Sequence, residues 1–492
     1  MNIDVETRWT ERLPPEVWQI VLHFTSSETI RDCLGVSRLF HDIAARKIFS
    51  SLRIRFGSWE VAYELTDKPP EDNECRTCCV LLRILTDPVF ASYVKHLDIL
   101  AFADKLAPFE MCSLTKAIGA MYNLRTFRWH TVSGTFTMPS NELLGTLAST
   151  CGRLRGCSLP FSIQCLDALR SLKRLPVTNF SMELVHPDTP GAEFESLDAY
   201  RTSLASLFEA YQGSLTWLSA PSQVIWGCPV YIMQGLTHLS IHHVEHLSNI
   251  TLLFRHCIRL ESLDIQYPDE PPTTLFAALA ANPAALPHLT HLKIRLHPGI
   301  NQSGLDALAA FIRSKKNLRC LDFSDRGSTI PELASMLSAI ESSSGLEVLG
   351  IDVYFDTLGL NDLAILRRTI PKTVTALRLR LLYSPFDMDE PPEENIPWIE
   401  LWAGLPRLAF AHVEDNEADP TVWYDDLAEA VKSLKLLARR ASFHEVERID
   451  GNFTLGDSWS HTKVQFRTVE DFGCEDWEWL MRGHVLLDDL DY

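Results

Sequence analysis

The sequence predicts an α/β fold in which short strands alternate with helices, preceded by a small helical block. Two observations indicate the repeats: a six-residue apolar pattern recurs at near-constant spacing, and the segments between its copies have helical periodicity. A third indicates the block, because about forty N-terminal residues hold more apolar positions than so short a segment can bury alone. At 492 residues the chain exceeds the size of one hydrophobic core, so we expect several domains or a repeat array.

The repeated pattern has the form LxxLxI. Its clear copies are "LTHLSI" (236–241), "LESLDI" (260–265), "LTHLKI" (289–294), "LRCLDF" (318–323), "LEVLGI" (346–351) and "VTALRL" (374–379). Their central leucines follow one another in steps of 24, 29, 29, 28 and 28 residues. Fainter copies start at 94, 124, 154, 215 and 405. The alternation within each copy predicts a short strand with one apolar face.

Helices are expected between these strands. In "STIPELASMLSAIESSS", Thr329 and Glu332 form a capping box, Pro331 lies in the first turn, and an apolar face follows. "SGLDALAAFIRSKKN" and "TTLFAALAANP" repeat this arrangement. A strand and a helix in about 28 residues resemble the leucine-rich repeat, with the resemblance covering 94–410.

The resemblance implies parallel strands on a concave side and helices on a convex side. The asparagine or cysteine usual after the pattern is not regularly present, so we expect an irregular variant. The alternative is an ordinary α/β domain with buried strands, which seldom keeps so even a period.

The N-terminal block starts with "LPPEVWQIVLHF" and ends with "VSRLFHDIA". Pro14 and Pro15 predict a helix that begins near Glu16, whose carboxylate favours the positive end of the helix dipole. The start, the end and their separation resemble the F-box, a helical motif of about fifty residues. Thr25 and Thr29 depart from the family's usual residues, and Phe40 replaces a common tryptophan. The matching residues are Leu13, Pro14, Glu16, Val17, Ile20, Val21, Phe24, Ile30, Leu34, Val36, Ser37, Arg38, Phe40, Ile43 and Ala44.

In the family, the F-box binds a Skp adaptor, which joins the protein to a cullin scaffold in an SCF-type ubiquitin ligase. The whole chain therefore resembles a fungal-type F-box protein with a leucine-rich-repeat-like solenoid, and the resemblance implies a non-catalytic substrate receptor. The residues expected to contact the adaptor are Leu13, Pro14, Glu16, Val17, Ile20, Val21, Phe24, Ile30, Leu34, Val36, Ser37 and Phe40. Two alternatives stay open: the block is a helical cap on the first repeat, or the chain is a repeat scaffold outside any ligase.

These patterns predict five parts of the chain. We expect an N-terminal tail (1–9), an F-box (10–55), a linker and helical cap (56–92), the solenoid (93–412, irregular at 160–235) and an acidic C-terminal cap and tail (413–492). Within the third part, "KPPEDNECRTCC" (68–79) is interpreted as a linker that leads into a helix starting at "CCVLLRILTDPVF".

A target would bind the strand face that carries the residues on either side of each central leucine. One predicted column runs Ser240, Asp264, Lys293, Asp322, Gly350, Arg378, and the next runs His242, Gln266, Arg295, Ser324, Asp352, Arg380. The candidate substrate-binding residues are His242, Asp264, Lys293, Arg295, Asp322, Asp352, Arg378 and Arg380. One hypothesis is that they recognise acidic or phosphorylated groups, since arginine binds these in a bidentate manner. We favour the simpler interpretation that neighbouring strands pair opposite charges on a solvated face.

Composition narrows the possible partners. A net charge of −19 disfavours general binding to nucleic acid or anionic membranes. No apolar run has the length of a signal sequence or a membrane span, so we expect a cytoplasmic or nuclear protein with reduced thiols.

Two acidic zones account for much of the charge. Acidic residues outnumber basic ones 12 to one from Asp387 to Asp426, and 8 to one from Glu470 to the C-terminus. Such runs are usually solvated loops and termini. The alternative hypothesis is that they bind a basic target, with tryptophans as anchors. The candidate anchors are Trp398, Trp423, Trp477 and Trp479.

No metal, cofactor or catalytic site is expected. Cys75, Cys78 and Cys79 lack a second ligand pair at zinc-finger spacing. In the cluster of His238, His242, His243 and His246, the first two would share one face of a strand while His243 lies on the other, which is poor metal geometry. The chain also contains no nucleophile, phosphate-loop, dinucleotide or metalloprotease motif.

Overall fold

The computed structural model describes most of the chain. That part comprises residues 13–25, 27–55, 70–101, 108–131, 138–161, 169, 171–184, 197–242, 247, 249–266, 273–296, 302–325, 327–355, 360–383, 398–415, 421–449, 451–460, 463–464 and 467–484. The predicted N-terminal tail, the acidic run before Trp398, and His243 and His246 lie outside the described residues. The side chains of Trp398 and Trp423 lie outside them as well.

The chain divides into two compact units, Met1–Leu215 and Thr216–Tyr492. The helices of the first unit are α2 (Pro15–His23), α3 (Ser27–Asp32), the 3-10 helix η1 (Cys33–Gly35), α4 (Arg38–Ile48), α5 (Pro70–Thr86), α6 (Pro88–Ala91), α7 (Pro108–Ala120), α8 (Asn141–Thr150) and α10 (Leu197–Ala210). Its strands are β1 (Ser51–Arg55), β2 (His96–Ala101), β3 (Thr126–Thr131), β4 (Gly156–Phe161) and β5 (Asn179–Leu184), which pair in parallel in sequence order.

The second unit continues the strand–helix alternation. Its strands are β6 (Trp217–Pro221), β7 (His238–His242), β8 (Ser262–Gln266), β9 (His291–Leu296), β10 (Cys320–Asp325), β11 (Val348–Phe355), β12 (Ala376–Tyr383), β13 (Phe410–Asp415), β14 (Leu436–Arg439), β15 (Ser442–Ile449) and β16 (Asn452–Ser458). Strands β6 to β14 pair in parallel, and β15 and β16 add an antiparallel hairpin at the end.

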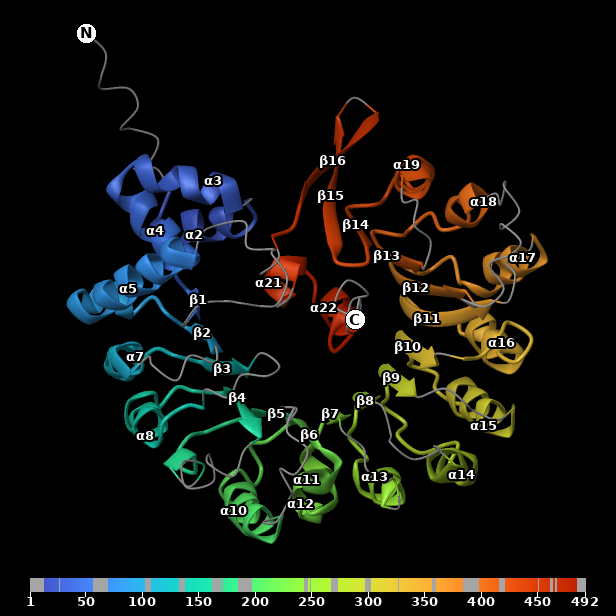
Figure 1. The fold of residues 1–492 in the computed structure, drawn as a ribbon, viewed down its shortest axis with the longest axis horizontal. Helices are drawn as coiled ribbons and strands as arrows, with labels where there is room; N and C mark the ends of the chain where they lie inside the picture. The colour runs from blue at the N-terminus through green and yellow to red at the C-terminus, as the bar shows by residue number, and fades with distance from the viewer. Residues whose placement is uncertain are drawn as a thin grey trace. The chain divides into compact units, whose positions relative to one another are not determined.

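Most helices of this unit lie on one side of the strands, whereas the last two, α21 (Val469–Phe472) and α22 (Glu475–Met481), lie on the other (Figure 1). The helices on the first side are α11 (Ser222–Trp226), α12 (Val230–Gly235), α13 (Ile250–His256), α14 (Thr273–Ala281), α15 (Gln302–Arg313), α16 (Ala334–Ser342), α17 (Leu360–Thr369), α18 (Trp398–Ala403) and α19 (Thr421–Ala430). We call the strand surface that α22 faces the inner face. The arrangement agrees with the leucine-rich-repeat-like solenoid expected from the spacing.

The core of the repeats follows from the alternation of the pattern. The leucine and isoleucine of each copy are buried, as Leu239 and Ile241 illustrate, because they pack between the sheet and the helices. Each buried strand therefore needs its neighbours to complete its apolar environment, as in other repeat arrays. No helix in the described part is long and apolar enough to cross a membrane.

Three boundaries differ from the sequence predictions. The segment interpreted as a linker is helical from Pro70, so the helix begins before the predicted start at Cys78. The sheet begins at Ser51, inside the range expected for the helical block. Helix α16 begins at Ala334 rather than at the predicted capping box, although the Glu332 carboxylate does accept a hydrogen bond from the Thr329 N–H at 2.8 Å.

Candidate functional site

The N-terminal block has a small core of its own. Leu22, Phe40 and Ile43 are buried, and the Trp18 ring packs edge-on against Phe40 with centroids 4.9 Å apart. The Ser37 hydroxyl caps α4 by accepting a hydrogen bond from the Phe40 N–H at 3.3 Å. These contacts hold α2 against α4 and fix the face that α2 turns away from the core.

That outer face is apolar and open to solvent. Ile20 is 61% exposed, Phe24 is 83% exposed and Val36 is 63% exposed, while Leu13 and Val21 are also exposed. Scattered single apolar residues are normal on a protein surface, and a group of them on one small block makes it a candidate interaction surface. The block therefore presents a second apolar face that its own core does not use.

The structure divides the residues predicted to contact an adaptor. Pro14, Glu16 and Ser37 are exposed with the apolar group above, and Val17 and Leu34 are half-buried. Ile30 and Phe40 are buried inside the block. These last two therefore support the face from behind rather than forming it.

The strand register brings the two predicted columns together on the inner face. Asp264 pairs with Lys293, Lys293 with Asp322, and Gly350 with both Asp322 and Arg378 across successive strands. In the second column, Gln266 and Ser324 flank Arg295, and Asp352 pairs with Arg380. Regular spacing along the sequence thus becomes a lattice of charged side chains in space.

Opposite charges in this lattice form ion pairs between strands. The Asp322 carboxylate lies 3.0 Å from Lys293 Nζ and 3.0 Å from an Arg378 Nη atom. A second Arg378 nitrogen lies 2.7 Å from Asp352. Neighbouring strands therefore pair opposite charges, as the simpler interpretation predicts. That interpretation is wrong in placing the pairs on a solvated face, because these four side chains are buried.

The other candidate residues lie around this centre. Arg380 Nε lies 3.0 Å from Glu414, and both side chains are buried. An Arg295 Nη atom lies 3.9 Å from the Asp264 carboxylate. His242, at the end of β7, is half-buried. The predicted binding residues therefore form a largely buried charged layer rather than an open surface.

The C-terminal segment (Glu475–His484) covers this part of the inner face. It comprises α22 and the three residues after it, and α22 contacts β10, β11 and β12. Lys293 Nζ donates to the carbonyls of Trp479 at 2.6 Å, Leu480 at 2.8 Å and Arg482 at 3.1 Å. Arg295 donates to the Gly483 carbonyl. The expectation of a solvated acidic terminus is therefore wrong for these residues, since their backbone carbonyls have buried cationic partners.

Burial and neighbouring charge fix the protonation of this network. Burial alone would raise the pKa of Asp322, but the hydrogen bond from His484 and the charges of Arg378 and Lys293 lower it well below its usual range. Burial and Arg378 lower the pKa of His484, so its neutral ring donates from Nε2 to Asp322 at 2.6 Å. Burial also lowers the pKa of Lys293, to about 8. The network therefore holds an ionised Asp322 among cationic partners at neutral pH.

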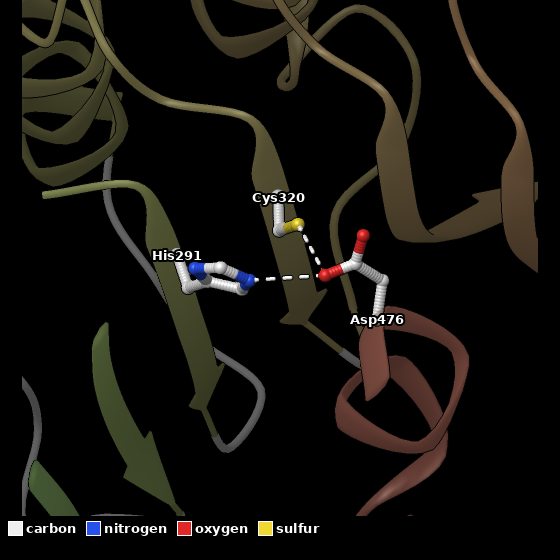
Figure 2. Close-up of side chains that lie close together, drawn as sticks. All are labelled: His291, Cys320 and Asp476. Carbon is white, nitrogen blue, oxygen red and sulfur yellow. Dashed lines mark hydrogen bonds and ion pairs between the residues drawn. The ribbon is translucent and has the colours of Figure 1, made fainter. Parts of the chain in front are cut away.

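His291, Cys320 and Asp476 bring three potential metal ligands together at the edge of this network (Figure 2). His291 and Cys320 are register partners on β9 and β10, and Asp476 reaches them from α22. The Asp476 carboxylate already pairs with Arg319, through contacts of 2.5 and 2.9 Å. Burial raises the pKa of the Cys320 thiol, so it is not a ready thiolate ligand. A guanidinium and a neutral thiol make this group an anchor for the C-terminal segment rather than a metal centre.

Sequence reasoning missed the role of Asp476, Gly483 and His484 and the docking of Trp479. The acidic count of the tail concealed an apolar and aromatic run, "WEWLM", which is the signal that could have indicated a folded segment. Of the proposed anchors for a basic target, Trp479 is 6% exposed and Trp477 packs on the same buried cluster.

The likenesses to solved structures described here are distant. No protein-family model matches the chain, and no curated protein matches it. Among solved structures, the leucine-rich repeat-containing protein LegL7 from Legionella pneumophila is 13% identical, with a TM-score of 0.34, over 68% of this chain and 97% of that one. A chain of the yeast Rad7 and Elc1 complex is 16% identical, with a TM-score of 0.46, over 75% of this chain and 89% of that one.

Proposed function

We propose that this protein is the substrate-recognition subunit of an SCF-type ubiquitin ligase. In this function the N-terminal block binds a Skp adaptor and, through it, a cullin scaffold, while the repeats hold a target protein. The chain performs no chemistry itself: it raises the effective concentration of target lysines near the charged ubiquitin carrier.

The observation that carries the proposal is the exposed apolar face of the block. A segment with the F-box pattern keeps Ile20, Phe24 and Val36 in solvent while Leu22 and Phe40 form its core. Burying such side chains stabilises a complex by about 25 cal/mol for each Å² of apolar surface removed from water. An adaptor surface would remove these exposed apolar side chains from water.

The test is co-purification of the full chain with a Skp adaptor. We expect Ile20→Asp to reduce capture at least tenfold, since it places a carboxylate in an apolar interface, with no change in thermal stability because Ile20 is exposed. Ile258→Asp is the matched control, because Ile258 is 57% exposed on the second unit. Equal capture of both variants would contradict the proposed interface.

The second candidate function is a repeat scaffold outside any ligase, which the repeats would serve equally well. Reconstitution with adaptor, cullin and ubiquitin carrier separates the two. A receptor supports ubiquitin transfer to a bound protein, and a scaffold binds the same protein without transfer.

A further inference from the structure

The C-terminal segment occupies the inner face in the manner of a bound ligand. Its contacts are made with strands that precede it by more than a hundred residues, and they combine charge, aromatic and backbone recognition. Each kind of contact recognises a different feature of the segment. Together, these features describe the kind of ligand that this surface would bind.

The first feature is the end of a helix. The last four carbonyls of an α-helix have no partner inside the helix, and the C-terminus carries a partial negative charge. Lys293 satisfies two of these carbonyls, at Trp479 and Leu480, and also bonds Arg482 just beyond the helix. A buried ammonium group in this position selects a ligand that ends a helix over it.

The second feature is an acidic residue followed by an indole. Asp476 in the first turn of α22 pairs with Arg319 and lies 3.3 Å from His291 Nε2. Trp479, three residues later on the same helix face, packs against the His291 ring at 5.2 Å and lies 4.9 Å from Lys293 Nζ. The spacing fits one helical turn, so both side chains reach the strands together.

The third feature is glycine after the helix. Gly483 has φ +73°, and a Cβ there would overlap the guanidinium of Arg295. Arg295 is fully buried, so it cannot move aside easily. The positive φ and the close approach of Arg295 therefore favour glycine at this position.

The inner face does not depend on the segment to pair its own charges. Asp322, Lys293, Arg378 and Asp352 all come from strands and form ion pairs with one another. Trp479, Leu480 and Met481 of the segment also join a buried apolar cluster with residues at the starts of β10 to β13. The charged layer beside this cluster is the part of the face that would regain hydration if the segment left.

We infer that the inner face of β9 to β12 is a receptor for helix ends, and that the C-terminal segment occupies it in cis until a target segment of the same chemistry replaces it. The target segment has an acidic residue, an indole three residues later, a helix that ends over Lys293, and a glycine beyond. The inference rests on the proposed function, because it names the class of protein segment that the receptor takes.

The test uses the full chain and a fluorescein-labelled peptide with the sequence of residues 474–484, with serine at the position of Cys474. Gly483→Ala should undock the segment in cis, and anisotropy should then show peptide binding at least tenfold tighter than to the unsubstituted chain. Gly451→Ala is the matched control, since Gly451 also has positive φ, +87°, but has no neighbouring atom within 4 Å of the added Cβ. A peptide with alanine in place of Trp479 should bind at least tenfold more weakly.

Two results would overturn the inference. One is that the Gly483→Ala chain binds the native and alanine peptides equally or binds neither. The other concerns the Gly483→Ala variant and a double variant that carries Asp476→Asn and Trp479→Ala. If hydrogen exchange shows the segment still docked in both proteins, the inference fails, because a segment that a target can replace must be able to leave the face. Adaptor capture by the same variants is measured separately, so its loss would count against the proposed function alone.

Discussion

At the scale of single residues, burial of His412 makes the stability of the protein depend on pH. Its ring is buried on β13, and Nε2 lies 2.9 Å from the Arg440 carbonyl, so a neutral ring with a proton on Nε2 satisfies the contact. Burial lowers the pKa of His412 from 6.5 to about 3, and the nearby charges of Arg378, Arg467 and Arg380 act in the same direction. His412 therefore stays neutral in the folded state, whereas in the unfolded chain it would be protonated below about pH 6.5.

Stability should fall in acid through this residue. Because the pKa of His412 is lower in the folded state, the unfolded state binds more protons than the folded state below pH 6.5. The free energy of unfolding therefore decreases as the pH falls from 6.5 toward 3. From pH 7 to pH 5 we expect His412 to account for a loss of about 2 kcal/mol in the free energy of unfolding. Urea denaturation of His412→Gln, whose amide can still donate to the carbonyl, should show that much less pH dependence. An identical pH dependence in both proteins would contradict the assignment.

At the scale of elements, the hairpin of β15 and β16 closes the array. Phe443 on β15 stacks on Trp459 with centroids 5.0 Å apart, and Phe472 of α21 packs on the same indole at 5.3 Å. This aromatic cluster covers the end of the core at β14, where a further repeat would otherwise be needed. Repeat arrays generally require such a terminal cap.

Removing that indole should loosen the end of the array. Trp459→Ala leaves a cavity in a buried cluster, and we expect a loss of about 3–5 kcal/mol in the free energy of unfolding. Ile449→Ala on the same hairpin is the control, because Ile449 is 62% exposed and should change stability little. Chemical denaturation measures both, and equal effects would show that the hairpin is not a cap.

The elements also show what could be predicted from the sequence. The register of the inner face followed from the leucine spacing, because a fixed period places equivalent residues of neighbouring strands side by side. The start of α2 near Glu16 followed from local helix signals. The docking of Asp476 on Arg319 did not, because that contact spans 157 residues and no local pattern specifies it. For the same reason, the acidic tail could not be distinguished from a solvated terminus.

At the scale of the whole molecule, the chain holds two compact units, each with its own buried residues. In a repeat array, stability comes from individual repeats and from the contacts between neighbours, so separate units need not unfold together. We expect more than one unfolding transition. Trp459→Ala should shift one transition in calorimetry and leave the other unchanged, and a single transition that moves as a whole would contradict this expectation.

The position of the C-terminal segment has a consequence for synthesis. Arg319 emerges from the ribosome 157 residues before its partner Asp476. At about 5–20 residues per second, roughly 10 to 30 s pass between them. Late in that interval, once β12 has been made, the inner face is complete but its covering helix is not. A nascent chain therefore meets other proteins with this surface open, and only the finished chain can close it.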